Sequence, residues 1–128
     1  MKKLPRTIPM FFLAFGLVAL AAHAFAAPSV SPFPPISAAQ ALANQGQTVT
    51  VEGVASIHQD SRLGSYIDLD GQWPATHFSA YIPDGNEHVF PPIQSLVGHI
   101  VDITGTIGIR RGIATIIITD ASQLRVVR

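Results

Sequence analysis

A nine-residue pattern occurs twice in this chain, at Val49–Ile57 and at Val101–Ile109. In both copies apolar residues fall at every second position, and a glycine stands at the centre, Gly53 in the first copy and Gly105 in the second. Alternation with a period of two is typical of a strand with one buried face, because successive side chains point to opposite sides. A glycine weakens the middle of a strand unless the strand bends or bulges there. Two long strands that bend at the middle therefore predict a small barrel.

The start of the chain has the pattern of an export signal. Three basic residues precede an apolar run at Met10–Ala22, and Ala24–Ala26 has the small-x-small pattern that signal peptidase recognises. The run is shorter than the roughly 18 residues expected of a membrane-spanning helix. We therefore predict a signal peptide at residues 1–26, cleavage near Ala26, a periplasmic location and no membrane attachment after cleavage. A retained membrane anchor is the alternative.

Cleavage leaves 102 of the 128 residues, which is enough for one domain with a single core. This part has five arginines, no lysine and eight acidic residues, so its net charge is −3. A mildly acidic domain has no general electrostatic attraction for nucleic acid. The chain contains no cysteine, which excludes disulfides, thiolate metal sites, cysteine catalysis and lipid attachment through a thiol.

The exported part divides into a proline-rich linker at 27–35 and a domain at 36–128. Ser37 and Gln40 have the spacing of a capping box, and the alanine-rich segment that follows predicts a short helix ended by Gly46.

Beyond that helix the alternation predicts five strands, and the last residues of the chain allow a short terminal strand. A helical turn between the third and fourth strands has an apolar stripe formed by Ile93, Leu96 and Val97. The Ile116–Ile118 run indicates that part of the fifth strand is buried on both sides. The five strands are predicted at about 48–58, 65–70, 77–82, 99–109 and 113–119.

Five strands with one helical element between the third and fourth follow the order of an OB-fold. The segments Gly46–Gly53, Leu96–Gly105 and Arg111–Leu124 resemble the opening strand and the closing half of bacterial OB-fold (oligonucleotide/oligosaccharide-binding) domains, of which the small exported type is nearest. The resemblance covers residues 36–127 and consists of glycines and alternating residues. It implies an all-β fold, a five-stranded Greek-key barrel, and it does not specify a ligand.

In OB-folds the ligand lies on the outer face of the second and third strands, between two flanking loops. Aromatic rings on such a face stack on bases, and arginines contact phosphate, so single-stranded nucleic acid is one candidate ligand. The same side chains also suit a peptide, glycan or protein partner, or they only cover their cross-strand neighbours. The predicted ligand-binding residues are Tyr66, Tyr81, Trp73, His77, Asp68, Arg62, Arg110 and Arg111.

Histidines and carboxylates indicate little catalytic chemistry. His77 and Asp68 are expected to face each other across the second and third strands, as a weak metal site or an acid–base pair. No two histidines have the spacing of a metal-ligand motif, so we predict no metal and no cofactor. The chain has no nucleophile elbow, no zinc-protease motif and no phosphate-binding glycine loop. We predict a binding module without catalysis for a peptide, glycan or protein partner, with single-stranded nucleic acid binding as the alternative.

Overall fold

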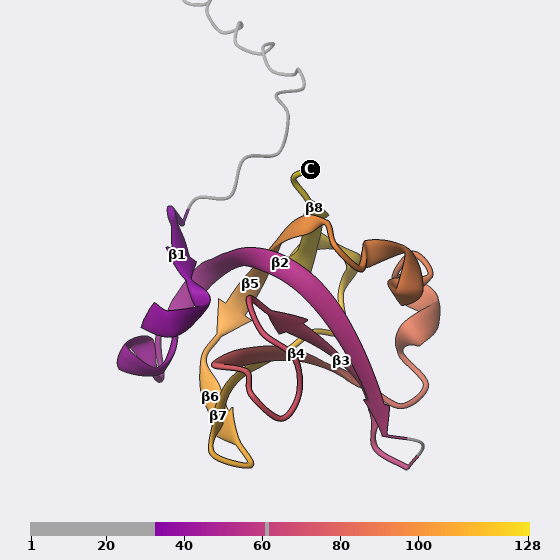
Figure 1. Cartoon of the computed structure of the whole chain (residues 1–128), viewed down its shortest axis with the longest axis horizontal. Helices are drawn as coiled ribbons and strands as arrows, with labels where there is room; N and C mark the ends of the chain where they lie inside the picture. The colour runs from indigo at the N-terminus through magenta and orange to yellow at the C-terminus, as the bar shows by residue number, and fades with distance from the viewer. Residues whose placement is uncertain (1–32, 61) are drawn as a thin grey trace, which may run out of the picture. The chain divides into compact units, whose positions relative to one another are not determined.

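The structure of the protein, a computed structural model, describes residues 33–60 and 62–128. The predicted signal peptide at 1–26 and most of the predicted linker at 27–35 lie outside these residues. The described chain forms eight strands and five single turns of 3-10 helix (Figure 1). The strands are β1 (Pro35–Ser37), β2 (Thr48–Asp60), β3 (Gly64–Leu69), β4 (Phe78–Pro83), β5 (Ile100–Thr106), β6 (Gly108–Arg110), β7 (Ile113–Ile117) and β8 (Leu124–Val126). The turns are η2 (Ala38–Gln40), η3 (Leu42–Asn44), η4 (Glu87–Val89), η5 (Ile93–Leu96) and η6 (Ala121–Gln123).

The strands pair in the order β6-β7-β4-β3-β2-β5-β8, and β1 adds to β2 in parallel. Within residues 33–60 and 62–128 this hydrogen-bonded path ends at β6 and β8 and does not close. The predicted all-β class is confirmed, whereas the predicted five-stranded barrel is wrong in strand number and in closure. The difference in strand number has two sources. The first and last strands of the described chain, β1 and β8, are additional, and a break divides the fourth predicted strand into β5 and β6.

The fourth predicted strand is interrupted at Ile107, which separates β5 from β6. The Ile107 N–H donates to the carbonyl of Gln47 at 3.0 Å, and the Ile107 carbonyl accepts from the N–H of Gly46 at 2.8 Å. Before this residue β5 pairs antiparallel with β2, and after it β6 pairs antiparallel with β7. The strand therefore changes its pairing partner from β2 to β7 at Ile107, whose side chain is buried in the core.

The longest strand, β2, curves as it crosses the sheet, as Figure 1 shows. Its first half pairs with β1 and β5, and its second half pairs with β3. A Cβ atom on Gly53 would lie 2.8 Å from a carboxylate oxygen of Asp70, and one on Gly105 would lie 2.5 Å from Cγ2 of Ile116. Both glycines are therefore points where a neighbouring side chain approaches the backbone closely.

The core lies on the inner face of the curved sheet and contains the residues predicted to point inward from the second and third predicted strands, although burial does not alternate there, because every residue of β3 is buried. The fifth predicted strand, β7, is buried on both faces for part of its length, as predicted, at Ala114, Thr115 and Ile116; the Ile116–Ile118 run does not carry this burial, because Ile117 is 54 % exposed. The residues predicted to point inward from β3 and β4 have no exposed surface: Ile67, Leu69, Phe78, Ala80 and Ile82.

The alanine-rich segment after Ser37 forms the two turns η2 and η3 instead of the predicted single helix. The side chain of Gln40 accepts the N–H of Ser37 at 2.9 Å, as the capping-box spacing predicts, and Gly46 ends the segment with a φ of 86°. Only Ala38 and Ala41 are buried here. Because two small side chains form no wide apolar stripe, packing does not stabilise a longer helix.

The helical turn predicted between the third and fourth strands forms as η5, which follows η4. Ile93 and Leu96 pack into the core, whereas Val97 is 52 % exposed. Two of the three residues predicted for the apolar stripe therefore face inward. The third lies at the surface beside the site described next.

Candidate ligand-binding site

A row of aromatic rings crosses three neighbouring strands on the outer face of the sheet. His58 of β2 lies directly opposite Tyr66 of β3, and Tyr66 lies opposite Tyr81 of β4. The His58 and Tyr66 ring centres are 4.5 Å apart and nearly parallel, and those of Tyr66 and Tyr81 are 5.0 Å apart. Trp73, from the turn after β3, stacks on His58 at 4.7 Å. We call these four residues, with Arg110 described below, the aromatic row.

Arg110 ends the row at the other side. Its guanidinium carbon lies 4.0 Å from the centre of the Tyr81 ring, and its Nε–H donates to the hydroxyl of Tyr66 at 3.3 Å. That hydrogen bond raises the pKa of the Arg110 guanidinium above its ordinary value. The hydroxyl of Tyr81 donates to the carbonyl of Leu63, so both tyrosine hydroxyls have partners.

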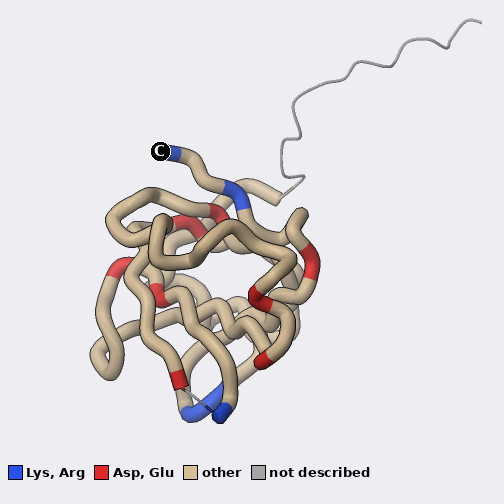
Figure 2. Tube along the Cα trace, turned by 90° about the vertical axis from the view of Figure 1, so that its right-hand side faces the viewer, with Lys and Arg blue, Asp and Glu red and all other residues tan. Residues whose placement is uncertain are grey.

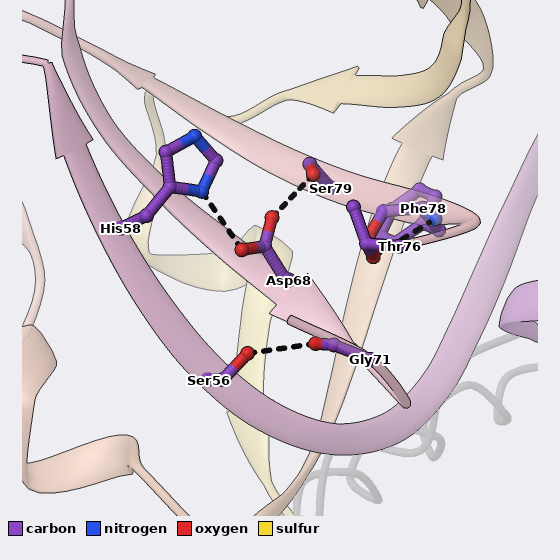
Figure 3. A network of polar contacts seen from close by, with 7 residues as sticks. All are labelled: Ser56, His58, Asp68, Gly71, Thr76, Phe78 and Ser79. Carbon is purple, nitrogen blue, oxygen red and sulfur yellow. Dashed lines mark hydrogen bonds and ion pairs between the residues drawn. The ribbon is translucent and has the colours of Figure 1, made fainter. Parts of the chain in front are cut away.

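A buried carboxylate, that of Asp68, lies between His58 of the row and Ser79 and is bonded to both (Figure 3). Asp68 is 1 % exposed; one oxygen accepts from the Ser79 hydroxyl at 2.5 Å, and the other lies 2.8 Å from Nδ1 of His58. Because a carboxylate has no proton to donate, the proton of this bond is on Nδ1. In neutral His58 the other ring nitrogen, Nε2, is therefore an acceptor.

This arrangement differs from a serine–histidine–aspartate triad. The carboxylate of Asp68 stands between Ser79 and His58, whereas in a triad the histidine stands between the other two. The Ser79 hydroxyl donates to the carboxylate of Asp68 and not to the imidazole of His58. His58 is therefore not placed to take the proton of Ser79. The network orients side chains, as a second layer of hydrogen bonds does around other binding sites.

The structure brings together most of the predicted site residues, with one correction. The expected contact between His77 and Asp68 is wrong, because β4 begins at Phe78 and its register places Ser79 opposite Asp68. His77 is exposed just before that strand. The histidine that contacts Asp68 is His58. The alternation along β2 places His58 on the outward face, and this is the sequence signal that could have found it. Tyr66, Tyr81, Trp73, Asp68 and Arg110 do lie on one face, as predicted.

Burial changes what the tyrosines can do. Tyr66 is 4 % exposed and Tyr81 is 9 % exposed, because neighbouring side chains of the row cover them. Their ring faces are therefore not open to stack on a base. Trp73, at 41 % exposed, is the most exposed ring of the row, and the His58 side chain is 20 % exposed.

Two shallow clefts lie beside Trp73. One, of about 260 Å³, is lined by residues that include His58, Gln72 and Trp73; the other, of about 340 Å³, is lined by residues that include Val54 and Asp70. The two clefts share three lining residues, Ser56, Gln72 and Val97. They are therefore neighbours along β2, and we call the two clefts together the Trp73 groove.

The remaining predicted residues lie at the end of the molecule where the β2–β3 turn and the β6–β7 hairpin meet. Arg111 lies 3.6 Å from Asp60, and the backbone N–H of Arg62 donates to Asp60 at 2.9 Å. That backbone bond, together with the positive charge of Arg111 and Arg62, lowers the pKa of the Asp60 carboxyl. Figure 2 shows arginine positions gathered at this end beside an acidic one. Arg110, of the same hairpin, does not contact Asp60; its guanidinium lies on Tyr81 and bonds Tyr66.

The part of the chain that the structure describes contains no group of three histidine, cysteine or acidic side chains placed to hold a metal ion. Over the same residues, no helix has both the length and the apolar character needed to cross a membrane.

Comparisons with known proteins give one structural likeness. No family model matches the sequence, and no curated protein matches it. A crystal structure of a protein provisionally named aspartyl-tRNA synthetase, from Leishmania major Friedlin, is similar, with 12 % identity and a TM-score of 0.45. The match covers 84 % of this chain, but the chain spans only 23 % of that protein's length. We draw no conclusion on fold or function from a likeness of this size.

Proposed function

We propose that the chain is an exported, periplasmic binding module of OB-like architecture, which binds a peptide, glycan or protein partner without catalysis. The OB-like assignment is supported by the pairing. If β5 and β6 are two halves of one strand bent at Ile107, that strand joins β2 on one side and β7 on the other. With β3, β4 and β7 this gives the strand neighbours of an OB-fold, to which β1 and β8 are added in this eight-stranded, open sheet.

One observation carries the binding function. An aromatic row fixed by a buried carboxylate ends in a tryptophan that is 41 % exposed and lines a groove. Packing of the core does not require an exposed indole at this position. The hydrogen bond between His58 and Asp68 holds the ring on which the indole stacks in one orientation. Rigid aromatic surface beside polar groups is typical of ligand sites, because little conformational freedom is lost when the ligand binds.

The experiment uses the fluorescence of Trp73, the single tryptophan of the chain. Peptides, oligosaccharides and oligonucleotides are titrated separately, and at least one peptide or sugar is expected to shift its emission and saturate. The matched control is Ile109→Ala, which removes a side chain of similar exposure (42 %) away from the groove and is expected to leave binding unchanged. Absence of any saturable response across the three classes would count against the proposal.

Single-stranded nucleic acid binding is the second candidate, and the three arginines at the β2–β3 and β6–β7 end favour it. Phosphate contacts would make affinity for an oligonucleotide fall as salt rises, with a slope of about −0.7 for each neutralised phosphate. The double variant Arg110→Ala, Arg111→Ala is expected to reduce that slope. A salt-independent affinity, or no affinity at low salt, would exclude this candidate.

A further inference from the structure

We propose that a cationic peptide binds this protein as an added β-strand, along the open edge of β2 at Ile57 and Gln59, with its apolar side chains in the Trp73 groove. This inference rests on the proposed binding function of the same site and adds the chemistry of the ligand and its mode of binding. Three properties lead to it: the free edge of β2, the apolar side chains beside that edge and the charge around it.

The edge of β2 that faces away from β3 is paired along only part of the strand. β5 pairs with it as far as Val54. The next residue, Ala55, accepts from the N–H of Gly98 and donates to the carbonyl of His99, both at 2.9 Å. Beyond Ala55, β2 continues to Asp60, and among the described strands it pairs there only with β3.

Two residues beyond Ala55 have free backbone groups on this edge. The bonded pairs of an antiparallel ladder fall at every second residue, and at one such position the N–H of Asp70 donates to the carbonyl of Val54 at 2.9 Å. Ile57 and Gln59 lie an odd number of residues from Val54, so their N–H and carbonyl groups point away from β3, and no described residue bonds to these groups. Gln59 is exposed and Ile57 lines the Trp73 groove, so a ligand can reach this edge. An unpaired strand edge is the surface to which an extended peptide adds as a further strand.

Apolar side chains lie exposed beside this edge. Val54, Trp73 and Val97 line the Trp73 groove, and each is between 41 % and 52 % exposed. A strand added to β2 points every second side chain to the face that carries His58 and the indole stacked on it. Apolar residues at these positions of the peptide cover the exposed indole and its apolar neighbours.

The opposite face of the same edge is acidic. Gln59 points to this face, where its amide donates to the Ser65 hydroxyl at 3.2 Å, and both residues line a cleft of about 300 Å³. Asp84 and Glu87 line the same cleft, and neither forms an ion pair with a described residue. Lysine or arginine at the alternate positions of the peptide therefore brings positive charge to carboxylates that have no cation beside them.

Charge also favours a peptide over a second copy of this chain. The groove adds a further exposed carboxylate, that of Asp70, and no lysine or arginine lines either the groove or the cleft. Two copies joined edge to edge at β2 bring these carboxylates toward one another, whereas a cationic peptide brings opposite charges together.

The test uses a heptapeptide in which lysine and leucine alternate, with both ends capped, titrated into the purified protein by calorimetry and by Trp73 emission. It is expected to bind with an affinity that falls as salt rises, because opposite charges at the surface attract less strongly in salt. The same peptide with glutamate in place of lysine is expected to bind at least about tenfold more weakly.

Methylation of the peptide backbone tests strand addition without any change to the protein. Only every second N–H of an added strand points to β2. One peptide is methylated on the backbone nitrogens of its lysines and the other on those of its leucines. One of the two is expected to lose at least about tenfold in affinity and the other to stay within about threefold, and which of them loses affinity gives the direction of the added strand.

Variants locate the site. Gln59→Pro removes one N–H of the open edge, and Gln59→Ala loses the same side-chain bond to Ser65 but keeps that N–H. The proline variant is expected to bind the lysine peptide about fivefold more weakly than the alanine variant, the effect of one hydrogen bond. Trp73→Ala is expected to weaken binding about tenfold in calorimetry. Ile109→Ala is the control, with no change expected, and circular dichroism in urea checks that each variant is folded.

The outcomes separate this inference from the proposed function. Equal affinity for the two methylated peptides overturns strand addition, and equal affinity for the lysine and glutamate peptides overturns the cationic ligand; both results leave the binding module intact. Saturable binding of an oligosaccharide without peptide binding has the same consequence. Self-association that Gln59→Pro abolishes, without peptide binding, assigns the edge to a second copy and overturns the peptide. If no ligand of any class binds, both the function and this inference are wrong.

Discussion

Replacing Asp68 with alanine tests whether the buried carboxylate stabilises the aromatic row. The change removes two charge-assisted hydrogen bonds, at 2.5 Å to Ser79 and 2.8 Å to His58. Hydrogen bonds to charged groups contribute about 1.5–3 kcal/mol each, but removing the carboxylate also removes part of its desolvation cost. Ser79, at 3 % exposed, keeps an unpaired hydroxyl away from water, whereas the His58 side chain, at 20 % exposed, can reach solvent. We expect the free energy of unfolding to fall by about 3 kcal/mol.

Urea unfolding followed by Trp73 emission measures this loss, because the indole stacks directly on His58. Asp68→Asn keeps the shape and one acceptor, so its cost should be smaller, about 1–2 kcal/mol. Asp84→Ala is the matched control, since Asp84 is exposed, and its effect should stay within about 0.5 kcal/mol. If Asp68→Ala unfolds with the wild-type free energy, the hydrogen bonds do not hold the row, and the argument for a fixed site fails.

Three further predictions concern the sheet itself. Gly105→Ala places a Cβ 2.5 Å from Cγ2 of Ile116 and should lower the free energy of unfolding by about 1–3 kcal/mol in urea titrations; no loss would mean that the strands separate easily. Phe78→Ala empties a fully buried position and should cost about 3–5 kcal/mol by the same measurement, unless the core collapses around the space. Asp102 lies opposite Glu52 and has one buried oxygen without a partner, so its carboxylate favours a protonated, donating Glu52; this, then burial, raises the pKa of the Glu52 carboxyl above its ordinary 4.5. Protonated Glu52 therefore stabilises the fold, and this contribution is lost as pH rises through the raised pKa. Comparing Glu52→Gln with the wild type between about pH 4 and pH 8 should show a smaller decline in the free energy of unfolding above pH 4.5 in the variant; parallel curves would contradict the raised pKa of Glu52.

The strand positions and the inner face could be predicted because burial on one side of a strand repeats every second residue, a property local to the sequence. Ile67, Leu69 and Phe78 lie in the core as this rule predicts, whereas the burial of Asp68 and Ser79 on the opposite face does not follow from it. The break at Ile107 and the pairing of β1 with β2 could not be predicted. Both depend on hydrogen bonds to segments distant in sequence, such as that from the Ile107 N–H to Gln47.

The candidate site shows the same division. Alternation by itself determined that Tyr66, Asp68 and Tyr81 point outward from two adjacent strands. Only the tertiary structure decided that His58 contacts Asp68, because the register of β2 on β3 places His58 opposite Tyr66 and within reach of that carboxylate. It also decided that the tyrosines are covered while Trp73 stays exposed, since a strand pattern states the face of a side chain and not what packs over it.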